Sequence, residues 1–435
     1  MNRTLVWSLS VALAGFLFGF DTIVISGADQ KLQEIWDSSD LFHGTVVMGM
    51  ALWGTVVGAL FGGYPTDYYG RKKTLIIIGA LYLVSALGSA AANDPFTFAT
   101  FRFIGGLGVG ASTIAAPSYI AEIAPAKQRG RLVALYQFSI VFGVLIAFFS
   151  NYMLRAMGEN AWRWMIGIEA LPAFLYCMVI LTIPMSPRWL LTKGRTQEAM
   201  DILSRIDPKK DISSILKELE PNSKRSKESI FMIKYRIPLL LAFFIAFFNQ
   251  FSGINAFWYY APRILETAGL GEDSALLSTV GIGFINVLFT LLGVFLIDKL
   301  GRKQLLYWGS FGYIVSLGAV SLSFILGWPG LITVIFFLLF VASHAMGQGT
   351  VIWVFISELF PNHLRASGQA FGSAVHWVLA AIIPSMIPFL FGAIGPGMVF
   401  LFFTIMMVFQ LVWVHLKMPE TKGISLEKLS RDITQ

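Results

Sequence analysis

Long stretches without a charged side chain alternate with short charged segments along this chain. The charge-free stretches 132–154, 237–262 and 274–297 are each longer than the roughly 20 apolar residues that a helix needs to cross a bilayer. Two longer stretches, 304–357 and 366–416, must each fold back once, because neither fits within a single span. The pattern predicts an all-α membrane protein.

Glycine and proline residues supply the turns inside the two long stretches. Residues 327–330 interrupt the first with the sequence GWPG, and the segment GAIGPG, which begins at Gly392, interrupts the second. We therefore expect twelve transmembrane helices. Their approximate ranges are 4–27, 44–64, 74–92, 96–122, 132–153, 162–184, 237–262, 274–297, 304–326, 331–357, 366–391 and 397–416.

The composition agrees with a membrane protein. Hydrophobic residues make up 56% of the chain and charged residues only 13%, whereas a soluble domain has about 25% charged residues. The first apolar segment is longer than the roughly 7 to 15 apolar residues of a signal peptide and contains Asp21, so we expect it to be retained. Cys177 is the only cysteine, which excludes an intrachain disulfide.

The basic residues indicate which side of the membrane each loop occupies. With a cytoplasmic amino terminus, the inner segments contain 27 of the 32 Lys and Arg residues. The outer segments contain only Lys31, Arg155, Arg163 and Arg263, and the remaining residue, Arg102, lies inside a span. We therefore expect a multi-pass protein of the cell membrane, inner or plasma, with both termini cytoplasmic. The same asymmetry explains the net charge of +7, so no nucleic-acid partner is expected.

An internal duplication accompanies the spans. One motif, DxxGRK, follows spans two and eight, and another, ExxPxxxR, follows spans four and ten. The copies are separated by 231 and 236 residues, so the two halves have the same orientation, as in a parallel repeat. The repeated residues are Asp67, Gly70, Arg71 and Lys72 with Asp298, Gly301, Arg302 and Lys303, and Glu122, Pro125 and Arg129 with Glu358, Pro361 and Arg365.

These motifs suggest a charged gate at the cytoplasmic face. A single copy could be turn chemistry with basic residues that set topology, but paired copies favour ion pairs that form across the two halves in one state and separate in the other. The candidate gate residues are Asp67, Arg71, Glu122, Arg129, Asp298, Arg302, Glu358 and Arg365.

The duplication also divides the chain. We expect a six-helix half at 1–184, a cytoplasmic linker at 185–235, a second six-helix half at 236–416 and a cytoplasmic tail at 417–435. The linker segment SPRWLLTKGRTQEAMDILSRI has apolar residues at helical spacing and charges on its other side, which predicts short helices. These helices either only join the halves or also brace the gate.

Several strings along the chain together resemble the sugar porters of the major facilitator superfamily. They are LFGFDTIVISG in span one, GRKK, PSYIAEIAPAKQRGRL, SPRWL, NQFSGINAFWYYAP, DKLGRK, ISELFPNHLR and PETKG, and they run from about residue 15 to residue 423. Within that family the chain is most similar to bacterial proton symporters for pentoses and hexoses. The resemblance implies the major facilitator fold, with twelve helices in two six-helix halves, and import of a monosaccharide with a proton by alternating access.

Three ionisable residues lie inside the spans of the first half. Asp21, Arg102 and Glu169 are each six or seven residues from the outer end of their span, which places them at one depth. Ionisable groups in lipid are costly and mark a function or a partner. A movement that separated Asp21 from Arg102 would convert motion into proton uptake. A static ion pair between two helices is the alternative, but proton-coupled sugar porters generally have Asp and Glu at these positions, so the resemblance implies proton coupling.

The second half has amides in place of charges. Asn249, Gln250 and Asn255 lie in span seven, and the last two share a helix face only if Gly253 loosens the winding. Amides suit sugar hydroxyls because both groups donate and accept hydrogen bonds, and aromatic rings cover the apolar face of a sugar. By resemblance, the sugar-contacting positions are Phe18, Gln137, Asn249, Gln250, Asn255, Tyr259, Asn286, Trp353 and Trp377.

Three departures from the family pattern leave the particular sugar open. Asn249 stands where the family usually has the first of two glutamines, and Thr350 replaces the proline that usually precedes the tryptophan of span ten. His376 stands beside Trp377 where the bacterial xylose carrier has glutamine, and it either contacts the sugar, responds to pH or satisfies a backbone group.

The sequence leaves three alternatives to a proton-coupled monosaccharide symporter. They are a facilitative sugar uniporter, a symporter of a related polyol such as inositol, and a nontransporting sugar sensor. We find no P-loop, HExxH or framed GxSxG motif, so the sequence does not predict an enzyme, and no cofactor or metal is expected. The expected partners are the sugar, the proton and the lipid bilayer, and the chain is expected to act as a monomer.

Overall fold

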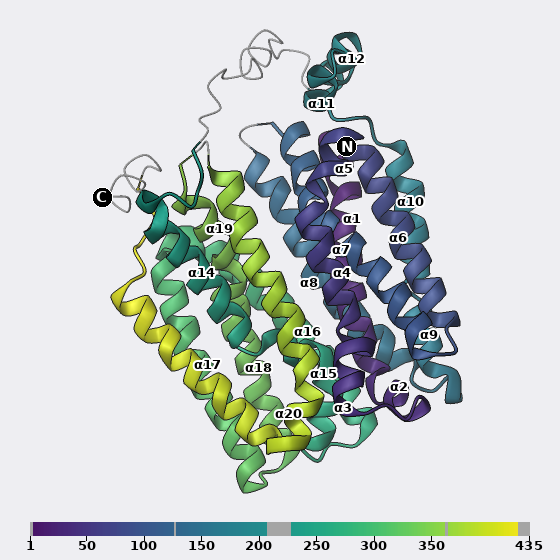
Figure 1. Ribbon diagram of the computed structural model, residues 1–435, viewed down its shortest axis with the longest axis vertical. Helices are drawn as coiled ribbons and strands as arrows, with labels where there is room; N and C mark the ends of the chain where they lie inside the picture. Colours follow the sequence, from purple (N-terminus) through teal and green to yellow (C-terminus); the bar gives the residue numbers. More distant parts are fainter. Residues whose placement is uncertain (1–2, 126–127, 207–227, 362–363, 425–435) are drawn as a thin grey trace.

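The computed structural model describes residues 3–125, 128–206, 228–361 and 364–424, and within these ranges the chain forms helices and no strand (Figure 1). The expected linker and tail therefore fall partly outside the described residues, at 207–227 and 425–435. The all-α architecture predicted from the hydrophobic pattern is confirmed.

Two helical bundles lie side by side in Figure 1. The first bundle consists of α1 (Arg3–Val24), η1 (Ile25–Gly27), α2 (Asp29–Ile35), α3 (Asp40–Phe42), η2 (His43–Met48), α4 (Met50–Phe61), α5 (Gly63–Tyr68), α6 (Arg71–Ala91), α7 (Pro95–Ile123), α8 (Arg129–Leu154), η4 (Gly158–Asn160), α9 (Ala161–Gly167) and α10 (Ala170–Thr182). Next come α11 (Pro187–Thr192) and α12 (Thr196–Ile206), the short helices expected in the linker. The second bundle consists of η5 (Ile233–Tyr235), α14 (Arg236–Phe251), α15 (Ile254–Thr267), α16 (Glu272–Leu300), α17 (Arg302–Leu326), α18 (Gly330–Met346), α19 (Gln348–Leu359) and α20 (Arg365–Leu416).

Eleven helical segments in the described part of the chain are long and apolar enough to cross a membrane. The last, α20, has 52 residues and contains two helices, because Gly395 breaks it with a φ of 80°. Gly327 likewise ends α17 with a φ of 66°. Both fold-back points expected from the sequence are therefore turns, and the described residues contain the twelve expected spans.

Glycines allow the closest contacts between helices of the first bundle. A Cβ atom added at Gly19 of α1 would lie 2.0 Å from the carbonyl oxygen of Ile140 in α8. A Cβ atom added at Gly106 of α7 would lie equally close to the carbonyl oxygen of Ala51 in α4. Small residues permit such backbone approach between membrane helices. The contacts fix α1 and α7, which carry Asp21 and Arg102.

The break between α14 and α15 is the distortion expected at Gly253. This residue has a φ of 78°, a left-handed conformation that glycine adopts without steric cost. Its Cα packs so closely on the ring of Phe403 that an added Cβ would lie 2.5 Å from Cδ2. The break turns the chain between Gln250 and Asn255, so that both side chains reach the same space.

The bundles meet at one end of the molecule. We call the end that carries α11, α12 and the described chain termini the linker end, and the opposite end the far end (Figure 1). Toward the far end, a Cβ added at Gly44 of η2 would lie 2.1 Å from the carbonyl oxygen of Ser385 in α20. There α20 also packs on α3 and α4, α16 on α8, and α15 on η1 and α2. The far end is therefore closed by direct packing between bundles.

Candidate functional site

A buried ion pair lies in the middle of the first bundle. Arg102 Nη1 is 2.6 Å from Asp21 Oδ1, and Arg102 Nη2 donates to the Asp21 carbonyl oxygen at 2.9 Å. Both side chains are almost completely buried. The expected proximity of Asp21 and Arg102 is therefore present in the structure, and it joins α1 to α7.

Glu169 completes a cluster of three ionisable groups. It lies between α9 and α10, is fully buried, and interacts electrostatically with Asp21 and Arg102. Neither of its carboxyl oxygens has a hydrogen-bond partner within hydrogen-bonding geometry among the described residues. Two carboxyl groups thus share one guanidinium group, and a single proton on either carboxyl group would neutralise the cluster.

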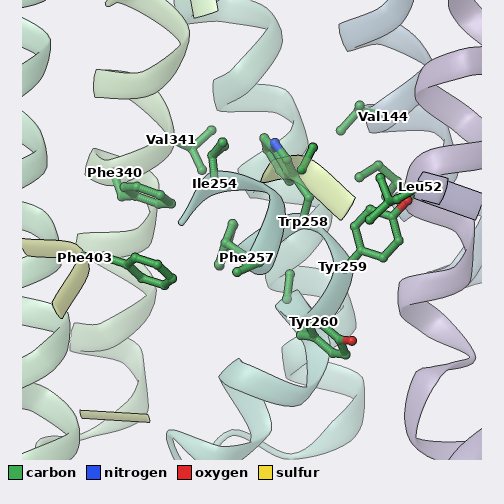
Figure 2. Close-up of a cluster of buried hydrophobic side chains, with 14 of the residues drawn as sticks. Leu52, Val144, Ile254, Phe257, Trp258, Tyr259, Tyr260, Phe340, Val341 and Phe403 are labelled. Atoms are coloured by element: carbon green, nitrogen blue, oxygen red, sulfur yellow. The ribbon is translucent and has the colours of Figure 1, made fainter. Parts of the chain in front are cut away.

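Two residues beside this cluster matter for its environment: Gly105 leaves space for the Asp21 carboxylate, and Tyr259 connects the cluster to the second bundle. A Cβ atom at Gly105 of α7 would lie 2.4 Å from Ser85 Oγ and 3.3 Å from Asp21 Oδ1, so only glycine fits beside the carboxylate. Tyr259 of α15 is buried and interacts electrostatically with Arg102 and Asp21. In Figure 2, Tyr259 extends toward Leu52 of α4, whereas Phe257 lies on the side of Phe340 and Phe403. The helix α15 therefore packs within the second bundle and also reaches the first.

Hydrogen bonds bring four of the predicted sugar-site residues together. Asn255 Nδ2 donates to Gln250 Oε1 at 2.8 Å, and Gln250 Nε2 donates to Asn249 Oδ1 at 3.0 Å. The same Gln250 nitrogen lies 3.0 Å from Nδ1 of His376. The group consists of three amides and one imidazole, and all four side chains can exchange hydrogen bonds with hydroxyl groups.

Aromatic rings extend this polar group toward the first bundle. The rings of Trp353 and His376 have centroids 4.9 Å apart, as do those of His376 and Trp377. Phe18 of α1 then lies 5.7 Å from the ring of Trp377 in α20. The predicted site therefore spans both bundles, with polar groups next to ring faces, as carbohydrate sites require.

Gln137 and Asn286 are placed less centrally by the described contacts. Gln137 is half-buried on α8 and Asn286 is buried on α16, and no hydrogen bond between either of them and the amide group is observed among the described residues. The two helices pack against each other where the bundles meet. Their predicted contact with sugar stays a prediction.

The motif residues pair within each bundle. Arg71 lies 2.9 Å from Glu122 and 3.0 Å from Asp67. In the second bundle, Arg302 lies 2.8 Å from Glu358 and 3.2 Å from Asp298. Arg129 and Arg365 begin α8 and α20. The ion pairs of Arg71 and Arg302 with these carboxylates thus lie within one bundle each. The predicted pairing across the halves stays a hypothesis for another state.

A hydroxyl group completes each motif pair. Ser186, just before α11, hydrogen-bonds to Glu122, and Thr421 of the PETKG segment donates to Glu358 at 2.6 Å. Trp189 of α11 also donates to the carbonyl oxygen of Asp67 at 2.9 Å. The segments that follow the last helix of each bundle therefore hold equivalent motif residues, which favours the bracing role that the sequence left open.

The far end has an ionic connection that the sequence did not reveal. Asp29 of α2 is buried, lies 2.6 Å from Arg263 of α15, and is 2.7 Å from Nε2 of buried His43. Arg263 also donates to Gln33 at 2.5 Å. We call Asp29, His43 and Arg263 the far-end latch, since they connect the two bundles by an ion pair where little water reaches it.

Two kinds of functional residue were missed by sequence reasoning. Asp29, His43 and Arg263 lie at or beyond the ends of their predicted spans, where charges are ordinary. The buried amides Gln348 and Gln410 lie within predicted spans, and the same criterion that selected Gln137 would have found them.

The architecture, the buried ion pair and the amide group define a multi-pass membrane protein of the transporter class. The family described as "Sugar (and other) transporter" matches residues 7–433. The arabinose-proton symporter of Bacillus subtilis (strain 168) is 33% identical over 442 residues, covering 99% of this chain and 95% of that protein. The D-xylose-proton symporter of Escherichia coli (strain K12) is 32% identical over 470 residues, covering 98% of this chain and 96% of that protein.

A solved structure shows the same fold. The inward-open conformation of the xylose transporter XylE from E. coli superimposes with a TM-score of 0.87 at 30% identity, covering 99% of this chain and all of that chain. The chain belongs to the sugar transporter family, and the family and major facilitator fold expected from its motifs are confirmed.

The latch predicts that Arg263→Gln opens the far end. Loss of the buried ion pair with Asp29 removes an attraction between the bundles, so Ser385, at the contact of α20 with η2, becomes accessible. We expect Arg263→Gln to raise labelling of Ser385→Cys in the purified protein several-fold by a hydrophilic thiol reagent, in a Cys177→Ala background.

Lys31→Gln is the matched control for the latch. Lys31 pairs with Glu34 on the same helix α2, at 2.9 Å and largely exposed, so this pair connects no bundles. Its removal should leave the labelling unchanged. Equal labelling of Arg263→Gln and the parent chain, at equal abundance, would rule out the latch.

Proposed function

We propose that this chain is a proton-coupled symporter that imports a monosaccharide by alternating access. It lies in the cell membrane with both termini in the cytoplasm, and it acts as a monomer. The linker end then faces the cytoplasm and the far end faces outward. The observation that carries the proposal is the buried cluster of Asp21, Arg102 and Glu169, which Tyr259 contacts electrostatically from the second bundle.

Charge balance gives this cluster a role in proton coupling. With Asp21 paired to Arg102, Glu169 is the second carboxyl group beside a single guanidinium group, and an ionised Glu169 would leave a buried negative charge uncompensated. A proton on Glu169 removes that charge while the ion pair stays intact. When this proton leaves toward the cytoplasm, Arg102 is attracted by both carboxylates, and the resulting shift of α1 and α7 moves the bundle.

The second bundle supplies the recognition of sugar. Asn255, Gln250 and His376 offer hydrogen-bonding groups that sugar hydroxyls can use, and Trp353 and Trp377 offer faces for the ring. Phe18 of the first bundle lies against Trp377 of the second, so a sugar that packs beside this pair of rings contacts both bundles. Relatives named for arabinose and xylose support a pentose as the first candidate.

The motif residues act as the cytoplasmic gate in this proposal. With the far end closed, Arg71 and Arg302 are held by glutamates of their own bundles. When the linker ends approach one another, these charges face the other bundle and exchange partners across the interface. The hydroxyl groups of Ser186 and Thr421 keep the glutamates in place during the exchange.

Uptake into vesicles tests the function directly. Purified protein is reconstituted and supplied with labelled xylose, arabinose, glucose, galactose, fucose or inositol, with and without an imposed proton gradient. We expect gradient-dependent accumulation of at least one monosaccharide. Equilibration without accumulation would support a uniporter, accumulation of inositol alone a polyol symporter, and no uptake of any compound a protein that does not transport sugar.

Asp21→Asn separates coupling from sugar movement. The variant keeps the size of the side chain but removes one negative charge, so an ionised Glu169 can pair with Arg102 and the cluster is neutral without a proton. Sugar exchange then continues, while the proton no longer drives uptake. We expect accumulation above equilibrium to fall to none and counterflow of labelled sugar to persist. Gradient-driven accumulation by this variant would contradict the coupling role.

Charge reversal of Glu122 tests the gate. In Glu122→Lys, Arg71 keeps Asp67 but loses the Glu122 carboxylate and faces a like charge, so closure of the cytoplasmic face becomes less favourable. If the closed state is destabilised by about 1.4 kcal/mol relative to the open state, its population falls about tenfold. We therefore expect the rate of uptake to fall about tenfold. Glu198→Lys, at an exposed ion pair of α12, is the control. Normal uptake by Glu122→Lys at normal abundance would exclude the gate.

A further inference from the structure

A chain of buried hydrogen bonds runs from the amide group to the opposite side of the second bundle. After Asn255, Gln250 and Asn249, the next amide is Gln348, whose Oε1 accepts from Asn249 Nδ2 at 3.5 Å. Gln348 Nε2 donates to Gln410 Oε1 at 2.8 Å, and Gln410 Nε2 donates to Ser310 Oγ at 2.7 Å. Ser310 in turn donates to the carbonyl oxygen of Leu306 at 2.7 Å.

All these hydrogen bonds point in one direction. Each amide accepts with its oxygen from the preceding group and donates with its nitrogen to the next, so the amides have one common polarity that ends on a backbone carbonyl. Hydrogen bonds arranged in this way strengthen one another in a low-dielectric interior. We call the series of Asn255, Gln250, Asn249, Gln348, Gln410 and Ser310 the amide relay.

Gln348 is the residue on which the polarity of the relay depends. It is fully buried at the first position of α19, and Gln410 of α20 and Ser310 of α17 behind it are fully buried as well. If the amide of Gln348 were reversed, its oxygen would face the amide oxygen of Gln410 and its nitrogen would face the amide nitrogen of Asn249. A buried polar group left without its hydrogen bond costs more than the bond contributes, so the orientation is fixed.

The fixed polarity determines which atoms the site offers to a ligand. Asn249 Nδ2 donates to Gln348, so Asn249 Oδ1 is free to accept from Gln250 Nε2. Gln250 Oε1 in turn accepts from Asn255 Nδ2. The oxygen of Asn255, which is half-buried, is then left to accept from a hydroxyl group. A site with fixed donors and acceptors rejects a sugar whose hydroxyl points in another direction, because its own buried groups stay without partners.

We propose that Gln348 is a positioning residue that sets the sugar affinity and selectivity of this transporter through Asn249, without touching the sugar. The proposal rests on the sugar transport proposed above. The step from Asn249 to Gln348 is the longest in the relay, at 3.5 Å against 2.7–3.0 Å for the other steps between side chains. It is therefore the step most sensitive to the lengths of the two side chains it joins.

A methylene exchange tests the relay. Gln348→Asn shortens one partner and Asn249→Gln lengthens the other, so the double variant preserves the combined length and both amides. We expect each single variant to raise KM for the best sugar about three- to tenfold, the range for loss of one or two hydrogen bonds, and the double variant to recover most of it. Vmax and accumulation at saturating sugar should stay near those of the parent chain.

Two further variants separate positioning from general stability. Gln348→Leu has a similar size but no amide, and it should raise KM and change the ratio of KM values for two epimeric sugars. Ser321→Ala is the matched control, because Ser321 also joins α17 to α20 by a buried hydrogen bond, to Gly397 at 2.8 Å, outside the relay. It should lower the melting temperature at most, with KM and selectivity unchanged.

The outcomes distinguish this inference from the proposed function. A parent chain that takes up no monosaccharide overturns both. If the parent chain transports sugar, unchanged KM and selectivity in Gln348→Leu and Gln348→Asn overturn the role of Gln348 alone. A third outcome is that the KM effects of Gln348→Asn and Asn249→Gln add in the double variant, with a lower melting temperature. That result shows a purely structural contribution and also overturns the role of Gln348.

Discussion

The ion pair between Asp21 and Arg102 is the interaction on which the first bundle depends. Removing a carboxylate and a guanidinium group from water is costly, and the cost is offset only where the two groups meet with good geometry. Here the guanidinium group contacts both the side chain and the backbone of Asp21. Gly105 of α7 leaves room for the Asp21 carboxylate, whereas Gly19 and Gly106 hold α1 against α8 and α7 against α4. Glu169 adds a second buried carboxyl group beside the pair, and the proposed proton coupling rests on this group.

The two bundles solve different problems with different polar groups. Carboxylates can exchange a proton, so they suit a coupling function, but their burial is expensive. Amides stay neutral and can hydrogen-bond to one another, as those of the relay from Asn255 to Ser310 do. A neutral network therefore lets a sugar replace a few hydrogen bonds without exposing a charge to lipid. Tyr259 and Phe18 lie where the two systems meet.

The ends of the molecule differ in how they are held. At the far end, the bundles share the buried pair of Asp29 and Arg263 and the close backbone contact between Gly44 and Ser385. At the linker end, Arg71 and Arg302 pair with glutamates of their own bundles, and Ser186 and Thr421 hydrogen-bond to those glutamates. Closure at one end thus coexists with internally satisfied charges at the other, as alternating access requires.

The sequence alone determined the twelve spans, the duplication and the family, because hydrophobic length and motif spacing are local properties of the chain. It also located Asp21, Arg102, Asn249, Gln250 and Asn255, since polar groups inside apolar spans are conspicuous. Only the tertiary structure decided which groups pair. Asp29 and Arg263 are 234 positions apart, and Gln348 and Gln410 are 62 apart, so nothing in their neighbourhoods indicates contact. Pairing depends on how the helices cross, and close contacts between glycines and backbone carbonyls distant in sequence set that crossing.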